Sequence, residues 1–200
     1  MTIPQRLVAA LRQQLAQRPV GARRVGWKYG SGDAERIDGE VAVGNLTAAT
    51  TLADGGTYRG GGGELRADAE VAVELGPRGE ISGYAAALEI CDLARRGAPE
   101  EIVASNIFHC AVAFGRFREM LPPDVSGALV VNGEVRAASR IADDVGDRVT
   151  AVARVLAAVG ESLRPGDRII TGLIVQVPLA PGDDVVADLG QLGRVALTIA

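Results

Sequence analysis

Apolar residues at two different spacings divide the chain into short strands and a few helices. Near the start, Ile3, Leu7, Val8, Leu11 and Leu15 recur at helical spacing, with arginines between them. This pattern predicts an amphipathic helix over residues 1–18 that packs on its own domain. A signal peptide is not expected, because charged residues interrupt the apolar positions.

Strands are predicted wherever apolar and polar residues alternate. In residues 23–29, Val25, Trp27 and Tyr29 share one face and Lys28 points to the other. Pairs of turn residues, such as Asn132-Gly133 and two Pro-Gly-Asp repeats, separate later segments. The further predicted strands are 41–46, 65–75, 81–90, the hairpin 129–136, 169–171, 175–179, 185–189 and 194–199.

Two more helices are predicted within this strand-rich pattern. One begins at Pro99, followed by two glutamates in its first turn, and continues at helical spacing to Cys110. The other covers 148–159 and ends at Gly160. The sequence therefore predicts an α+β fold, with residues 1–200 forming one domain.

Composition narrows the classes of function. The 200 residues are 48% hydrophobic and carry a net charge of −4, which suits one domain with a substantial core. No basic cluster is present and only 4% of residues are aromatic, so we expect no nucleic-acid partner. No segment is apolar enough for a membrane span, and Cys91 and Cys110 lie in apolar segments as reduced cysteines would. We therefore expect a cytoplasmic protein.

Three acidic residues are the main candidates for chemistry. Asp68 and Glu70 are two apart on a predicted strand, so both carboxylates face the same way. Glu89 lies in an apolar stretch of the next strand, where a lone charge needs compensation. With neither histidine nor thiolate expected nearby, three converging carboxylates favour Mg²⁺, Mn²⁺ or Ca²⁺ over Zn²⁺. The spacing is equally consistent with acids that face water.

Two basic residues invite a functional interpretation. His109 is four residues after Ser105 on the predicted helix, which permits a Ser-His pair, although a packed histidine is the more usual outcome. Lys28 stands out because almost all of the 21 lysine and arginine residues are arginines. A lysine can be kept for its tunable pKa, or it can be an ordinary exposed strand residue.

Several short motifs follow one another in a characteristic order along nearly the whole chain: Gly26-Trp27-Lys28-Tyr29-Gly30, Gly44-Asn45-Leu46, Asp68-Ala69-Glu70-Val71-Ala72, Ala87-Leu88-Glu89-Ile90-Cys91-Asp92, Ser105-Asn106, residues 163–172, Pro181-Gly182-Asp183 and Gly190-Gln191-Leu192-Gly193. Together these motifs resemble the fumarylacetoacetate hydrolase superfamily. The branch with the greatest similarity is that of the 2-hydroxypentadienoate (2-oxopent-4-enoate) hydratases and 4-oxalocrotonate decarboxylases.

The resemblance implies a mixed β-roll or sandwich, like the C-terminal domain of these enzymes, flanked by helices. It also implies a Mg²⁺ or Mn²⁺ ion and a homo-oligomer, or association with a related decarboxylase or hydratase. By position, it assigns the metal to Asp68, Glu70 and Glu89, and acid/base or water-orienting roles to Lys28 and Asn106. Substrate contacts fall on Ser105, Thr171 and Gly172.

The implied reaction is hydration of a 2-hydroxydienoic or 2-oxoenoic acid such as 2-oxopent-4-enoate. For proton transfer in this reaction, Lys28 would need a pKa lowered towards neutrality. Decarboxylation or tautomerisation of a related 2-oxo diacid is the alternative, and a catalytically degenerate subunit that partners an active homologue is another. Asp68 stands where the family usually has a longer glutamate. Hydrolysis of a C–C bond is less expected, because no histidine precedes the carboxylate strand.

Overall fold

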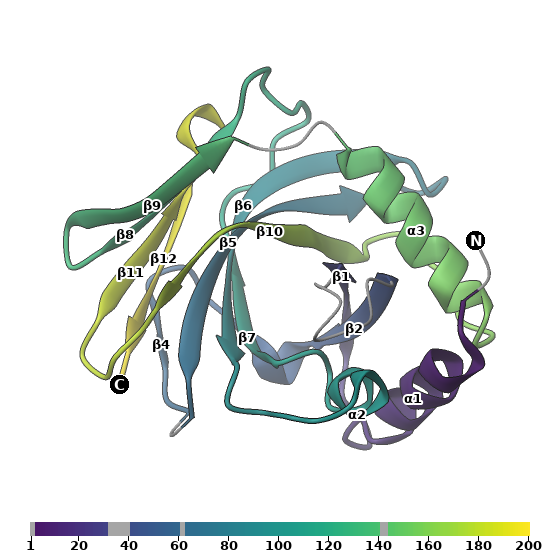
Figure 1. The fold of residues 1–200 in the computed structure, drawn as a ribbon. Coiled ribbons are helices and arrows are strands. Elements are labelled where there is room, and N and C mark those ends of the chain that lie inside the picture. Colours follow the sequence, from purple (N-terminus) through teal and green to yellow (C-terminus); the bar gives the residue numbers. More distant parts are fainter. Residues whose placement is uncertain (1–2, 32–40, 61–62, 141–143) are drawn as a thin grey trace.

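A computed structural model describes residues 3–31, 41–60, 63–140 and 144–200. Figure 1 shows an α+β fold in which two sheets and three helices share one core. The helices are α1 (Gln5–Ala16), α2 (Pro99–Ala104) and α3 (Val145–Ala157), with 3-10 turns η1 (Ala48–Thr50) and η2 (Gly190–Leu192). The strands are β1 (Arg24–Ser31), β2 (Val41–Thr47), β3 (Thr51–Leu52), β4 (Gly56–Tyr58), β5 (Leu65–Leu75), β6 (Ile81–Asp92), β7 (His109–Phe114), β8 (Ser126–Val131), β9 (Glu134–Arg140), β10 (Arg168–Pro178), β11 (Asp184–Asp188) and β12 (Arg194–Ile199).

The larger sheet is strongly curled and has the strand order β2-β1-β10-β5-β6-β7-β3 (Figure 1). Most neighbours are antiparallel, whereas β1 pairs with β10, and β3 with β7, in parallel. The second sheet, β4-β12-β11-β8-β9, packs against β5, β6 and β7. Its buried residues, such as Leu129, Val185 and Leu197, belong to the same core as Val71 and Leu88 of the larger sheet.

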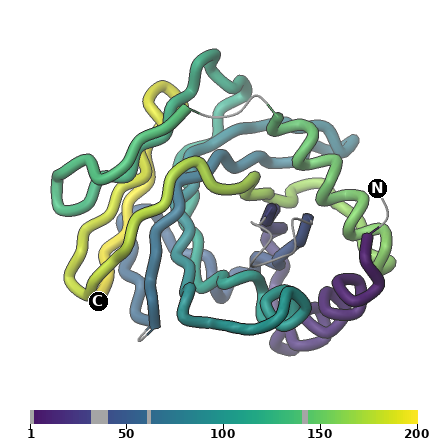
Figure 2. Tube along the Cα trace, in the orientation of Figure 1, coloured from purple at the N-terminus to yellow at the C-terminus, as the bar shows by residue number. Residues whose placement is uncertain are grey.

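The opposite face of the larger sheet lies inside the curl. Its apolar residues include Ala72, Ala85 and Ala87, all completely buried with Leu46 and Ile170. Small side chains occupy little volume, so this face leaves room for larger polar groups beside them. Figure 2 shows the same arrangement as a tube: the three helices lie beside β1 and β2, at one end of the larger sheet.

The N-terminal helix packs on the domain, as its spacing predicted. Leu7, Val8 and Leu11 are buried, and Gln14 joins α1 to its neighbours. The Gln14 amide donates to the main-chain oxygens of Val43 and Val103 at 3.2 and 2.6 Å and accepts from Asn45 at 3.0 Å. The helix therefore fixes the edge of the sheet that bears β2.

The structure corrects the expected helix over 99–110. α2 ends at Ala104, and Asn106, Ile107 and Phe108 have φ values of 67°, 50° and 63°. These left-handed conformations turn the chain, and His109 begins β7 instead of continuing the helix. The Asn106 side chain holds the turn, since its oxygen accepts from Asn45 N at 2.7 Å and its amide donates to Asn45 O at 3.0 Å.

The strands predicted at 169–171 and 175–179 are one strand, β10, with an irregular register on either side of Leu173. Gly172 has a φ of 99° there, a conformation that glycine adopts without steric cost. The other strand predictions are confirmed, including the hairpin around Asn132-Gly133. The two Pro-Gly turns are also confirmed, with φ values of 81° at Gly166 and 90° at Gly182.

Candidate functional site

The register of the β5–β6 hairpin brings the three predicted acids together. Asp68 lies directly opposite Glu89, and Glu70 is two residues further along the same face. Their exposed fractions are 6% for Asp68, 1% for Glu70 and 0% for Glu89. The acids therefore do not face water, which removes that alternative interpretation of their spacing.

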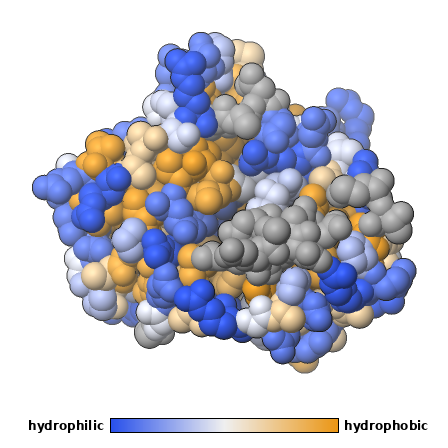
Figure 3. Space-filling view, in the orientation of Figure 1, coloured by the Kyte–Doolittle hydropathy of each residue, from blue (hydrophilic) through white to orange (hydrophobic). Residues whose placement is uncertain are grey.

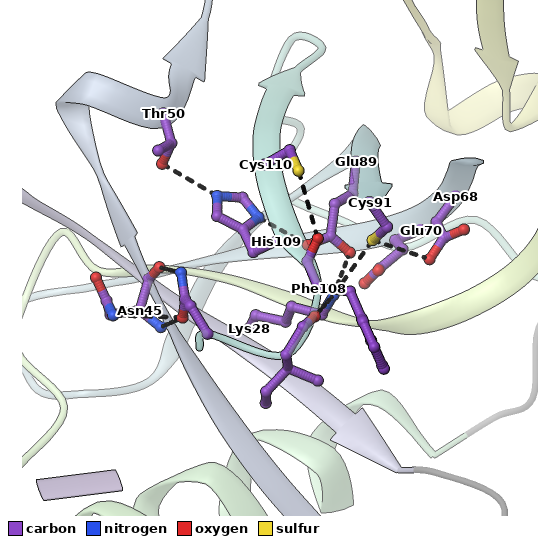
Figure 4. Close-up of polar contacts among 12 residues, drawn as sticks. Lys28, Asn45, Thr50, Asp68, Glu70, Glu89, Cys91, Phe108, His109 and Cys110 are labelled. Atoms are coloured by element: carbon purple, nitrogen blue, oxygen red, sulfur yellow. Dashed lines mark hydrogen bonds and ion pairs between the residues drawn. The ribbon is translucent and has the colours of Figure 1, made fainter. Parts of the chain in front are cut away.

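Lys28, the only lysine in the sequence, reaches this cluster from β1. Its Nζ lies 2.7 Å from Glu89 Oε2 and donates to the main-chain oxygen of Ile107 at 3.0 Å. Figure 4 shows the ammonium pointing towards the carboxylates. The interpretation of Lys28 as an exposed strand residue is excluded, since it is 6% exposed.

Two contacts from β10 hold the carboxylates of β5. The main-chain N–H of Gly172 donates to Glu70 Oε2 at 2.6 Å, and the Gln176 amide donates to Asp68 Oδ1 at 2.7 Å. The irregularity around Leu173 thus turns a backbone donor towards the site.

His109 lies behind Glu89, on the side away from Asp68 (Figure 4). Its Nδ1 is 2.7 Å from Glu89 Oε1 and its Nε2 is 3.0 Å from Thr50 Oγ1. Because an ionised carboxylate only accepts hydrogen bonds, Nδ1 carries a proton and donates it. The contact could not be predicted from sequence, because residues 99–110 were expected to form one helix. Ser105 and His109 do not pair, since Ser105 donates to Glu101 O and His109 contacts Glu89 and Thr50.

Cys91 also faces the site, which corrects the expectation that no thiol lies near the acids. Its Sγ donates to Asp68 Oδ2 at 3.6 Å and accepts from Lys28 Nζ at 3.5 Å. Ligand atoms of Asp68, Glu89 and Cys91 lie within 4.8 Å of one another, close enough to surround one ion. Cys91 is two residues after Glu89 on a strand, so alternation alone could have placed it on this face.

Burial and mutual repulsion govern the protonation of the acids. Burial, followed by the charge of Glu89, raises the pKa of Asp68 to about 6, and the same causes raise the pKa of Glu70 well above its ordinary value. Burial would also raise the pKa of Glu89, but Lys28 and His109 outweigh it and hold this pKa at about 2.

The pKa of Lys28 differs from the lowered value that proton transfer near neutral pH requires. Burial lowers this pKa, but the surrounding groups Cys91, Glu89, Glu70 and Asp68 outweigh burial and raise it above its ordinary value. With all three acids ionised, one ammonium leaves two negative charges in a buried place. A divalent cation would neutralise them, so the residues fit such an ion.

The site opens into a cavity of about 450 Å³. Lys28, Asp68, Glu70 and Cys91 form one part of its wall. Arg148 of α3 lines the cavity too and donates to the main-chain oxygen of Thr171 at 2.7 Å. The remaining lining residues are Tyr29, Gly30, Ser31, Leu93, Ile107, Phe108, Gly172, Leu173 and Gln176. The volume suits a small organic acid.

The other predicted site residues are placed differently. Gly172 lines the cavity, whereas the Thr171 hydroxyl is buried and donates to Val71 O at 2.9 Å. Ser105 is exposed, donates to Glu101 O at 2.9 Å and borders a separate groove between α1 and α2. Asn106 lies at the turn before His109, where its side chain binds β2. Neither Ser105 nor Asn106 is part of the cavity wall, and Arg148 and Gln176 were not predicted.

Solved structures with the same fold include a decarboxylase, a hydrolase and an isomerase. The 4-oxalocrotonate decarboxylase from Pseudomonas putida G7, complexed with calcium and acetate, has a TM-score of 0.83 at 22% identity, covering 97% of this chain and 86% of that chain. The fumarylpyruvate hydrolase from Pseudomonas aeruginosa, in complex with Mn²⁺ and pyruvate, has a TM-score of 0.65 at 18% identity, covering 90% of each chain. The 5-carboxymethyl-2-hydroxymuconate delta-isomerase from Mycobacterium smegmatis has a TM-score of 0.61 at 18% identity, covering 90% and 78%.

No protein-family model and no curated protein sequence matches the chain. The structural similarity confirms the fold class that the motifs implied: the chain has the mixed-sheet fold of these enzymes. Among the described residues, no helix is both long and apolar enough to cross a membrane.

Proposed function

We propose that this protein is a divalent-metal-dependent enzyme of the fumarylacetoacetate hydrolase superfamily that acts on a small 2-oxo acid. The observation that carries the proposal is the cluster of three buried carboxylates around the only lysine of the sequence, of which Lys28, Asp68 and Glu70 line one cavity. Solved structures of the same fold support it, because they hold calcium, magnesium or manganese together with small carboxylic acids.

The ion would be held by Asp68, Glu70 and Glu89, and Mg²⁺ or Mn²⁺ suits their oxygen atoms. When bound, it would act as a Lewis acid for charge that develops on the 2-oxygen of the substrate. Asp68 keeps its orientation through Gln176, and Glu70 through the backbone of Gly172. These contacts preorganise the ligands. Asp68 can therefore coordinate the ion although its side chain is one methylene shorter than that of a glutamate.

Lys28 is the residue placed to move a proton. Its ammonium is fixed by Glu89 and Ile107 at the cavity wall, where it can donate to a substrate carbon or oxygen and take the proton back. Cys91 raises the pKa of Lys28 most, followed by Glu89, Glu70 and Asp68, so neutralisation of these three carboxylates by a cation would lower this pKa. The apolar residues Leu93, Ile107 and Phe108 line the same cavity and would exclude bulk water from this transfer.

The reaction we favour is addition of water to a 2-hydroxydienoic or 2-oxoenoic acid such as 2-oxopent-4-enoate. Decarboxylation or tautomerisation of a 2-oxo diacid is the second candidate, and Arg148 is the observation in its favour. This guanidinium lines the same cavity as Asp68 and Glu70, where it could bind a second carboxylate. Asn106 and Ser105 would act in either reaction only by shaping the turn behind the cavity.

Calorimetric titration with Mg²⁺ and Mn²⁺, alone and with oxalate as a mimic of a 2-oxo acid, tests the proposal. Oxalate binding should require the ion and should disappear in Glu70→Ala, whereas the matched variant Glu134→Ala, on the exposed strand β9, should bind normally. Loss of absorbance of a dienoic acid or release of CO₂ then separates hydration from decarboxylation. A chain that binds neither ion would instead be a degenerate subunit that accompanies an active homologue.

We also propose that the chain forms a homo-oligomer. On the face shown in Figure 3, hydrophobic side chains gather over the region of β8 to β11. The exposed fractions of Val135 on β9 and Leu173 on β10 are 66% and 51%. Apolar areas of this kind often mark contact surfaces. Light scattering of wild type and Val135→Asp would test the proposal, since a monomeric wild type would contradict it.

A further inference from the structure

The segment that carries the Ile107 carbonyl has an unusual backbone. Asn106, Ile107 and Phe108 have φ values of 67°, 50° and 63°, and none of them is glycine. The Cβ atom disfavours this region, most of all in a β-branched residue such as isoleucine. Ile107 O nevertheless accepts from Lys28 Nζ at 3.0 Å, and Ile107 and Phe108 line the cavity. Three such residues in succession persist only where the surrounding structure holds them.

The side chain of Asn106 supplies this support by binding the free side of β2. Because β2 is the first strand of the larger sheet, one of its sides has no neighbouring strand among the described residues. Asn106 Oδ1 accepts from Asn45 N at 2.7 Å, and Asn106 Nδ2 donates to Asn45 O at 3.0 Å. The carboxamide thus satisfies both main-chain groups of Asn45, as a neighbouring strand would.

A glycine opposite Lys28 makes room for this contact. Gly44 of β2 and Lys28 of β1 are direct partners in the sheet. A Cβ at Gly44 would lie 2.9 Å from Asn106 Oδ1 and 3.3 Å from Lys28 Cβ. The Asn106 side chain therefore occupies the place that a side chain at position 44 would take, close to the base of Lys28. Any larger residue at position 44 would displace one of the two.

The N-terminal helix braces the same contact from behind. Gln14 of α1 is 3% exposed, and its Oε1 accepts from Asn45 Nδ2 at 3.0 Å. Its Nε2 donates at 2.6 Å to the main-chain oxygen of Val103 in α2, the helix that leads into the left-handed turn. Gln14 thus ties β2 to α2 on either side of Asn106. In Figure 4, Asn45 lies on the side of Lys28 away from Asp68.

We propose that Gln14, Asn45 and Asn106 form a clamp, with Gly44 opposite Lys28, that positions the Lys28 ammonium at the cavity. These three are positioning residues, because they act on Lys28 through the turn and the Ile107 carbonyl and are not part of the cavity wall. The inference rests on the proposed function only in that Lys28 is the group that moves the proton. It assigns a physical role to the Gly44-Asn45 motif and to the buried glutamine of α1.

Nuclear magnetic resonance of ¹⁵N-lysine-labelled protein tests the clamp. Since Lys28 is the only lysine, the labelled protein has a single side-chain ammonium signal. In the metal-free wild type, Glu89 and Ile107 O hold this ammonium, so its protons should exchange slowly and the signal should be visible near neutral pH. In Asn106→Ala and Asn106→Gly the signal should shift or broaden beyond detection. The glycine variant adopts the left-handed conformation without steric cost, so it keeps the test valid if the alanine variant fails to fold.

Two matched variants serve as controls. Asn132 is also a non-glycine residue with a positive φ, 53°, but it lies in the turn between β8 and β9. Gln13 is the exposed neighbour of Gln14 on α1. Asn132→Ala and Gln13→Ala should keep the wild-type signal, whereas Gln14→Ala should shift it. With 2-oxopent-4-enoate as substrate, Asn106→Gly should lower kcat by roughly 10–100-fold and change KM much less, because it misplaces a reacting group.

The outcomes separate the clamp from the proposed function, because the signal requires neither ion nor substrate. An unchanged Lys28 signal in folded Asn106→Gly would overturn the inference, since the side chain of Asn106 would then have no part in holding the ammonium. Loss of the signal in Asn106→Gly, from a wild type that binds neither Mg²⁺ nor Mn²⁺, would support the clamp and contradict the proposed function alone.

Discussion

Lys28 on β1 and Glu89 on β6 form a buried ion pair of 2.7 Å, although β10 and β5 lie between their strands in the sheet. The pair exists because the sheet curls, so that residues on its inner face meet across the curl. Lys28 is also the only nearby cation for Asp68 and Glu70 among the contacts described. Its removal therefore has consequences for both reaction and folding.

Lys28→Met should abolish turnover of the 2-oxo acid and destabilise the metal-free protein. Breaking a buried ion pair by removing one partner costs about 3–5 kcal/mol, because the remaining charge is uncompensated. A divalent ion should restore most of this loss, since it neutralises the same carboxylates. Urea unfolding with and without Mn²⁺ measures the effect, and Arg136→Met on exposed β9 is the control. Wild-type turnover in Lys28→Met would exclude the proton-transfer role.

His109 should act on the ion through Glu89, as a positioning residue. In His109→Asn the amide nitrogen takes the place of Nδ1 and can still donate to Glu89 Oε1, whereas His109→Gln places its amide nearer Thr50. We expect Mn²⁺ affinity to fall by roughly 10–100-fold in the Gln variant and to be largely retained in the Asn variant. Equal affinities in the two variants would show that the hydrogen bond to Glu89 does not matter for the ion.

The stability of the metal-free protein should decrease as pH rises through the titration of Asp68. This carboxyl has an ordinary pKa of 3.8, which the fold raises to about 6. Well below pH 3.8 it is protonated in both states, and above pH 6 the folded state must hold a disfavoured charge. A shift of about two units corresponds to at most about 3 kcal/mol.

Comparison with Asp68→Asn isolates this effect. The variant keeps an oxygen that can accept from Gln176 but does not titrate. The difference in free energy of unfolding between wild type and variant, measured from pH 4 to 7, should grow with pH in favour of the variant. Addition of Mn²⁺ at pH 7 should reverse the order. A difference that stays constant across this range would contradict the raised pKa.

Gly172→Ala should weaken ion binding as well as folding. A Cβ at Gly172 would lie 3.0 Å from both Arg148 Nη1 and Tyr29 Cδ1, at a φ of 99°. We expect a loss of about 1–3 kcal/mol in stability and displacement of the N–H that holds Glu70. Gly133→Ala is matched, because Gly133 also has a positive φ but has open space around it. It should lose stability without any change in Mn²⁺ affinity.

The hairpin of β5 and β6 could be predicted from sequence because its signals are local. Alternation placed Asp68 and Glu70 on one face, and the turn residues between the strands fixed which residues of β6 lie opposite. The position of Lys28 beside Glu89 depends instead on the curl of a sheet whose order mixes early and late strands. Alternation along β1 gives only the face on which Lys28 lies. The expectation that Lys28 acts at the same site as the three acids came from the motif resemblance.

The segment around His109 was predicted wrongly for a physical reason. Ile102, Val103 and Ile107 are all buried, and their spacing matches a helix. Asn106 to Phe108 adopt left-handed conformations, which the hydrogen bonds between Asn106 and Asn45 stabilise. Such a turn depends on a partner 61 residues away and has no local signature. Lys28 adds a further distant partner by binding Ile107 O.

The position of β10 between β1 and β5 sets the order of events during synthesis. β1 can pair with β2, and β5 with β6, in the first half of the chain, but β10 joins these two pairs into one sheet only after residues 168–178 have been translated. Gly172 and Gln176, which hold Glu70 and Asp68, arrive in the same segment. Pairings over such sequence distances form slowly, so a nascent chain exposes its unneutralised acids for most of its elongation. Binding of the proposed ion would therefore be a late step, after residues 168–178 have emerged from the ribosome.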